Sequence, residues 1–141
     1  NTIKSFGGKK VKDFYKSIKD VDYVSIHTPL TEESKNLINM KVLSSMKKSS
    51  IIINTSRGGV INENDLNEAL NKNIIFGAGL DVFEQEPPNK NNLLLKNKRV
   101  LLSPHVSTFT EECTERMSVE TIQNIIDFFD NKLNISKIVK T

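Results

Sequence analysis

The sequence predicts an α/β fold: an open parallel sheet with helices on both faces. Four short apolar runs, at residues 22–27, 50–54, 74–82 and 100–103, alternate with segments of helical spacing. The runs are continuously apolar rather than alternating with polar residues, which is typical of parallel strands covered on both faces. The connections are short, so each crossover is expected to be right-handed. With 141 residues the chain is long enough for one domain around one core.

The ends of the runs are marked by residues that stop a strand. The first run stops at Thr28-Pro29 and the last at Pro104, because proline cannot donate a hydrogen bond to a sheet. The second run, Ile51–Ile53, is β-branched and has almost no polar face, so we expect it to be buried on both sides. Glycines in the third run indicate close packing against that strand.

Helices are expected between the strands. Two of them cover Lys12–Ile18 and Met40–Met46, where apolar side chains recur at helical spacing. A third follows Asn62, whose side chain is expected to cap it, with Asp65 at its third position. Asn73 is expected to end this helix in the left-handed conformation.

The last helix is predicted to be the longest. Thr108 and Glu111 have the spacing of a capping box at its start. We expect the tail after Asn131, which is polar, to fray or to dock elsewhere. The predicted apolar stripe of this helix comprises Met117, Ile122, Ile125, Phe129 and Leu133.

The composition argues against several classes of function. The net charge is only +3 and the lysines are scattered without interleaved aromatic residues, so we expect no nucleic-acid partner. No apolar run approaches the roughly 18 residues of a membrane span, and the chain does not open on a signal peptide, so no membrane partner is expected. Cys113, the single cysteine, excludes an internal disulfide and fits a reducing, cytoplasmic location. No metal site is expected.

Three residues that follow predicted strands carry the chemistry. Arg57, Glu86 and His105 provide a guanidinium, a carboxylate and an imidazole. A guanidinium can hold a substrate carboxylate through two hydrogen bonds, and an imidazole beside a carboxylate can move a proton near neutral pH. In open parallel sheets, ligands bind beyond the carboxyl ends of the strands, so these residues are expected to share one rim. His27, at the end of the first strand, is interpreted as structural.

Several long motifs in order resemble the D-isomer-specific 2-hydroxyacid dehydrogenases, which include phosphoglycerate, glycerate and D-lactate dehydrogenases. The strongest stretches are Val24–Thr31, Ile53–Ala69 and Gly77–Pro87, within a resemblance that covers Val11–Leu133. The resemblance implies the second half of a Rossmann-type domain and an NAD-dependent oxidoreductase of 2-hydroxy acids.

The resemblance also implies roles for the three residues. Arg57 would bind the substrate carboxylate and carbonyl, His105 would be the acid and base, and Glu86 would stabilise its protonated form. Each also has a structural interpretation: Arg57 as a donor to loop carbonyls, Glu86 as part of a rigid turn and His105 as a buried, hydrogen-bonded side chain. Many members have two small residues after the histidine, whereas Ser107-Thr108 and then Phe109 follow here, which leaves the substrate open.

A second group of residues is implied to bind the cofactor. Asp81 matches the aspartate that orients the nicotinamide carboxamide; its alternative is a turn cap. Thr28, Pro29 and Ser56 match positions that line the nicotinamide and its ribose, as do the catalytic Arg57 and His105; the hydroxyls of Thr28 and Ser56 are alternatively ordinary strand-end groups. NAD is the expected cofactor, with NADP left open.

The phosphate-binding half of a dinucleotide site is missing from this sequence. No glycine-rich turn after a first strand and no acidic residue after a second one is found. Residues 1–141 are therefore expected to be a partial NAD-binding domain, without the glycine-rich half and the substrate domain that lie upstream in the family. Alone, this chain is expected to bind NADH weakly and to show no turnover.

Two alternatives to a dehydrogenase remain open. One is a binding module like the related corepressors, which sense the dinucleotide and act through partner proteins. The other is an inactive half-domain. The expected partners are a small 2-hydroxy or 2-oxo acid and, by analogy with the family, a second copy in a homodimer.

Overall fold

The computed structural model describes residues 5–138. The chain divides into two compact units, Asn1–His105 and Val106–Thr141. The first unit contains the whole sheet, and the second contains one long helix. The first four and last three residues of the predicted domain lie outside the described part.

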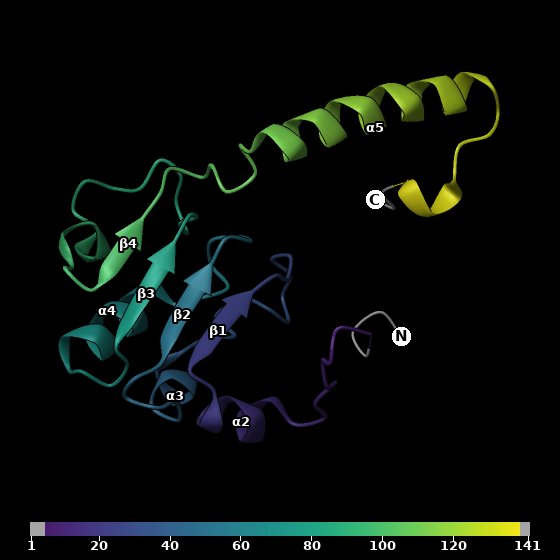
Figure 1. Cartoon of the computed structure of the whole chain (residues 1–141). Helices are drawn as coiled ribbons and strands as arrows, with labels where there is room; N and C mark the ends of the chain where they lie inside the picture. The colour runs from purple at the N-terminus through teal and green to yellow at the C-terminus, as the bar shows by residue number, and fades with distance from the viewer. Residues whose placement is uncertain (1–4, 139–141) are drawn as a thin grey trace. The chain divides into compact units, whose positions relative to one another are not determined.

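A four-stranded parallel sheet forms the centre of the first unit (Figure 1). Its strands pair in the order β1-β2-β3-β4 and all run parallel. The predicted fold class, an open parallel α/β sheet, is confirmed. The strands are β1 Tyr23–Ile26, β2 Ile51–Asn54, β3 Gly77–Leu80 and β4 Val100–Leu102.

Side chains at the amino ends of the helices set where the helices of the first unit begin. Asp13 caps α2 (Phe14–Ser17), which continues as the 3₁₀ turn η1 (Ile18–Asp20). Asn39 caps α3 (Met40–Leu43), which is shorter than predicted. As predicted, Asn62 caps α4 (Glu63–Asn71) by accepting a hydrogen bond from the Asp65 N–H. Asn92 caps the 3₁₀ turn η2 (Leu93–Lys96).

The prediction that the third strand starts at residue 74 is wrong, because Ile74 closes the preceding helix. Asn73 has the predicted left-handed backbone, with φ of 55°. The Ile74 N–H then donates to the Ala69 carbonyl at 2.8 Å, which ties this residue to α4 rather than to β2. Ile75 is nevertheless fully buried, so its side chain belongs to the core although its backbone is outside the strand.

The core lies on one face of the sheet. Ile52 and Leu80 point into a cluster that also contains Val42 of α3 and Leu66 of α4. The prediction that Ile51–Ile53 is buried on both sides is wrong: Ile52 is fully buried, whereas its two neighbours are only half-buried. The apolar side chains of α3 and α4 therefore pack on the same face of the sheet as Ile52 and Leu80.

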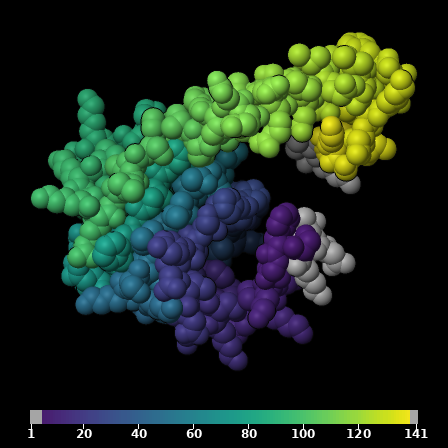
Figure 2. Space-filling view, in the orientation of Figure 1, coloured from purple at the N-terminus to yellow at the C-terminus, as the bar shows by residue number. Residues whose placement is uncertain are grey.

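The second unit contains α5 (Glu111–Phe129), and no α5 side chain is buried. The predicted cap of this helix is wrong. Thr110, not Thr108, accepts a hydrogen bond from the Cys113 N–H, so the helix begins two residues later than a Thr108 cap would start it. Leu133 of the predicted apolar stripe lies beyond the end of the helix. The other four side chains of the stripe, Met117, Ile122, Ile125 and Phe129, are exposed. In Figure 2, α5 lies in the part of the chain whose colour changes from green to yellow.

Candidate active site

The loop after β2 is built around the side chain of Asn54. This residue is 2% exposed. Its Oδ1 accepts hydrogen bonds from the N–H and the hydroxyl of Ser56, at 3.0 and 2.8 Å, and its Nδ2 donates to the Arg57 carbonyl at 2.8 Å. These three bonds satisfy a buried amide and fix the backbone of Ser56 and Arg57.

Arg57 itself is exposed, and its Nη1 donates to the Ser56 carbonyl at 2.6 Å. In the part of the chain that the structure describes, no carboxylate pairs with this guanidinium. Its charge is therefore not neutralised there by the protein, which is the state required to bind an anionic ligand.

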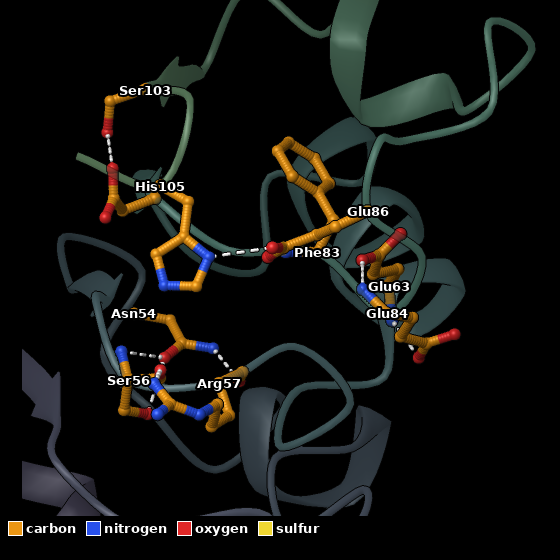
Figure 3. A network of polar contacts seen from close by, with 10 residues as sticks. Asn54, Ser56, Arg57, Glu63, Phe83, Glu84, Glu86, Ser103 and His105 are labelled. Carbon is orange, nitrogen blue, oxygen red and sulfur yellow. Dashed lines mark hydrogen bonds and ion pairs between the residues drawn. The ribbon is translucent and has the colours of Figure 1, made fainter.

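The loop after β3 brings Glu86 to His105. Glu86 Oε2 lies 2.7 Å from His105 Nδ1, and Glu86 Oε1 accepts a hydrogen bond from the Phe83 N–H at 3.0 Å (Figure 3). The hydrogen bond with His105, and then that from Phe83, hold the pKa of Glu86 below its ordinary value of 4.5. The ionised carboxylate is therefore the form of Glu86 that these contacts stabilise.

His105 has an unusual backbone for its residue type. Four described residues other than glycine have positive φ; three are asparagines, which tolerate the left-handed region, and the fourth is His105, with φ of 55°. Backbone strain at a non-glycine residue is typical of functional sites. The imidazole is half-exposed, with 46% of the side chain accessible.

Asp81 is a buried carboxylate directly after β3. It is 2% exposed, and its Oδ1 accepts a hydrogen bond from the Ser103 hydroxyl at 2.5 Å. Because Leu80 and Leu102 are partners in the register of β3 and β4, Asp81 and Ser103 follow them side by side. Asp81 thus lies on the rim that carries His105.

Thr28 and Pro29 follow β1, at the other end of the strand order. The Thr28 hydroxyl lies 3.4 Å from the Pro29 carbonyl, which also accepts a hydrogen bond from the Ser34 hydroxyl at 2.7 Å. Both of these hydrogen bonds lie within the loop of residues 28–34. Thr28 and Pro29 share the rim with the other candidate residues through the sheet register, but within residues 5–138 no hydrogen bond joins them to those residues.

Close backbone contact joins the Arg57 loop to the Glu86 loop at Gly58. A Cβ added to Gly58 would lie 1.7 Å from the Phe83 carbonyl oxygen and 2.6 Å from the Glu84 nitrogen. Only glycine fits here, so Gly58 is part of the site's framework. The residues that the sequence did not single out for such roles are Asn54, Gly58, Glu63 and Ser103. Asn54 ends a strand and Gly58 follows the arginine, but the partners of both become visible only in three dimensions.

A pocket of about 370 Å³ opens beside the Glu86–His105 pair. Asp81, Glu86 and His105 contribute polar groups to it, and Phe83 and Leu102 are among its apolar residues. Mostly apolar pockets with a few converging polar groups are typical ligand sites.

The polar groups at the rim fit the nicotinamide end of a dinucleotide. A carboxylate such as Asp81 accepts hydrogen bonds from a carboxamide, and the hydroxyls of Thr28 and Ser56 can donate or accept. The pyrophosphate end has no counterpart: within residues 5–138, no strand runs into a helix through a loop with three spaced glycines.

Between Ser5 and Ile138, no group of three or more His, Cys, Asp or Glu side chains is placed to hold a metal ion. Nor does any helix in that range have the length and apolarity needed to cross a membrane.

Proteins with similar sequences include glyoxylate reductases, a hydroxypyruvate reductase and D-3-phosphoglycerate dehydrogenases. A glyoxylate reductase of Thermococcus litoralis is 45% identical over 121 residues, which cover 86% of this chain and 36% of that protein. A hydroxypyruvate reductase of Thermotoga maritima is 39% identical over 109 residues, 76% of this chain and 36% of that protein. The chain spans about a third of the length of such relatives.

The fold is likewise that of solved dehydrogenases. The NAD complex of a D-isomer specific 2-hydroxyacid dehydrogenase from Lactobacillus delbrueckii ssp. bulgaricus superimposes with a TM-score of 0.80 and 30% identity, covering 90% of this chain and 43% of that one. Residues 2–107 match the family model described as D-isomer specific 2-hydroxyacid dehydrogenase, NAD binding domain. The chain therefore belongs to the D-isomer specific 2-hydroxyacid dehydrogenase family.

Proposed function

We propose that this chain carries the catalytic groups and the nicotinamide end of the cofactor site of an NAD-dependent 2-hydroxyacid dehydrogenase. The observation that carries the proposal is the 2.7 Å contact between Glu86 and His105, on the rim that also holds Arg57, which has no carboxylate partner within residues 5–138. A carboxylate bound to one nitrogen of an imidazole leaves the other nitrogen available to a substrate hydroxyl or carbonyl.

The cofactor would be held through the residues that fit its nicotinamide end. Asp81 would accept hydrogen bonds from the carboxamide, and Thr28, Pro29 and Ser56 would line the ring and its ribose. When bound, the nicotinamide supplies or accepts the hydride. The family is NAD-binding; the choice between NAD and NADP stays open.

The protein's own groups would orient the substrate and move the proton. Arg57 binds the substrate carboxylate through two hydrogen bonds and polarises the carbonyl, which fixes the orientation of the reacting carbon. In the reduction, His105 Nε2 donates a proton to the oxygen as it becomes an alcohol; in the oxidation, it accepts that proton. Because Glu86 holds Nδ1, it keeps the ring oriented.

The substrate class is a 2-oxo acid or the corresponding 2-hydroxy acid. Relatives named for glyoxylate and hydroxypyruvate share this group. Those two acids, with NADH, are therefore the first substrates to be assayed on the whole protein that contains this chain.

The deciding experiment replaces His105 by asparagine in that whole protein. Asparagine places an uncharged amide at the site and tolerates the positive φ of this position, so the variant separates acid–base chemistry from folding. We expect kcat to fall by about 10²–10⁴-fold, while the Kd for NADH changes by less than about threefold.

His27→Gln is the matched control, because His27 follows β1 and its Nε2 contacts the Ser25 hydroxyl at 2.7 Å. Near-normal turnover by His105→Asn would contradict the assigned role. Tight NADH binding without turnover of any 2-oxo acid by the unmodified protein would favour a dinucleotide-sensing module instead.

A further inference from the structure

Glu63, the first residue of α4, binds the loop that carries Glu86 through both carboxylate oxygens. Oε1 accepts a hydrogen bond from the Glu84 N–H at 2.6 Å, and Oε2 accepts one from Asn92 Nδ2 at 2.6 Å. The Glu63 N–H in turn lies 3.5 Å from Glu84 Oε1. In the view of Figure 3, Glu63 and Glu84 lie on one side of Glu86, and His105 lies on the other.

These contacts fix the loop on both sides of Glu86, at residues 84 and 92. The loop has little packing of its own, since residues 84–87 are exposed, whereas the three residues before them, Asp81, Val82 and Phe83, are buried. Hydrogen bonds to a carboxylate are stronger than neutral ones. Glu63 is therefore the main polar attachment between α4 and this loop.

We propose that Glu63 is a positioning residue, whose carboxylate holds the 84–92 loop so that Glu86 stays in contact with His105. Its importance for catalysis rests on the proposed function. Its effect on the Glu86–His105 pair does not, because that effect follows from the contacts alone.

The NMR signal of the His105 ring reports directly on the pair. The chain contains only two histidines, and His27 contacts Ser25, so His27 is an internal reference. The charged groups that act on Glu86 are His105 and Asp81. When Glu86 takes up its proton in acid, the His105 Cε1–H shift should show a separate step, whose midpoint lies below the ordinary glutamate value.

The experiment follows this step in the 141-residue chain and its Glu63 variants. In Glu63→Ala both attachments are lost, and we expect the midpoint to rise toward the ordinary value by about 0.5 pH unit. Glu63→Gln retains an acceptor for the Glu84 N–H but presents an amide to the donor of Asn92, so an intermediate rise is expected. Exchange of the Glu84 amide hydrogen should speed up about tenfold in Glu63→Ala.

Two matched variants separate positioning from general destabilisation. Glu68→Gln changes an exposed glutamate on the same helix that pairs with Lys72, and should leave the step in place. Asn92→Asp retains the acceptor that caps η2 at the Leu94 N–H but turns a donor into an oxygen facing Glu63. This variant should move the step in the same direction as Glu63→Ala.

The outcomes distinguish the two proposals. A step that stays within about 0.1 pH unit in Glu63→Gln and Asn92→Asp would overturn the positioning role. If Glu63→Ala does not fold, these two variants decide. A step that moves, in a whole protein without any dehydrogenase activity, would leave the positioning role standing and reject the proposed function. In an active whole protein, Glu63→Gln should lower kcat about tenfold without changing the KM for NADH.

Discussion

The loops that carry Arg57 and Glu86 are held in opposite ways. The loop after β2 is stabilised by a residue at its own start, Asn54, whose side chain forms hydrogen bonds with Ser56 and Arg57. The loop after β3 is stabilised by a residue of another element, Glu63 on α4, which accepts hydrogen bonds from Glu84 and Asn92. Gly58 joins the two loops through the carbonyl of Phe83.

One loop is therefore positioned by contacts that are local in the sequence, and the other by a contact between separate elements of the fold. The position of the Arg57 backbone follows from a strand end and its neighbours, whereas the position of Glu86 depends on a residue that lies before it, on another element. Three changes test the comparison: one that affects both loops, one that affects the first loop, and one that reports on the Glu86–His105 pair.

The largest effect is expected from Gly58→Ala. Its Cβ would lie 1.7 Å from the Phe83 oxygen and 2.0 Å from the Phe83 carbonyl carbon, and backbone atoms cannot move aside cheaply. Both loops must separate, at a cost on the order of 4 kcal/mol or more in the free energy of unfolding. Urea denaturation followed by circular dichroism measures this value.

Gly79→Ala is the control for that change. A Cβ at Gly79 would lie 3.8 Å from the nearest atom of Ile53, an ordinary contact, so we expect a change below about 1 kcal/mol. If the two alanine variants were equally stable, the two loops would not depend on the contact at Gly58.

Asn54→Ala should affect the first loop alone. It removes three hydrogen bonds in a buried position, and we expect a loss of about 2–4 kcal/mol in unfolding free energy. In the whole protein the KM for the 2-oxo acid should rise, because Arg57 is no longer held, while the acid step of the His105 signal stays where it is. A shift of that step as large as in Glu63→Ala would show that the two loops are not braced independently.

The smallest effect is expected from the Glu86–His105 pair, which is half-exposed. Its sign follows from the lowered pKa of Glu86: the ionised carboxylate stabilises the fold above the ordinary value of 4.5, and this contribution disappears as the pH falls through the lower folded value. A double-mutant cycle of Glu86→Gln and His105→Asn measures it. The coupling energy should be present near about pH 6 and shrink toward about pH 3. Coupling that grows in acid would contradict the assignment.

The strands were predictable because their signal is local. Continuous apolar runs predict parallel strands, and the sheet confirms all four in chain order, although not their burial on both faces. The errors also have local causes. Ile74 is apolar, but its N–H closes α4, and Thr108 has the right spacing to Glu111, whereas Thr110 is the residue whose hydroxyl reaches the helix.

For the candidate site, the sequence by itself determined the residue types and the rim. Arg57, Asp81, Glu86 and His105 each follow a parallel strand, and the carboxyl ends of such strands meet at one edge. The family resemblance implied that Glu86 acts on His105, but only the tertiary structure showed the contact itself, that Ser103 holds Asp81, and that Glu63 and Gly58 connect the loops. The physical reason is range: strand pattern and capping act over a few residues, whereas these contacts join groups that only the folded sheet brings together.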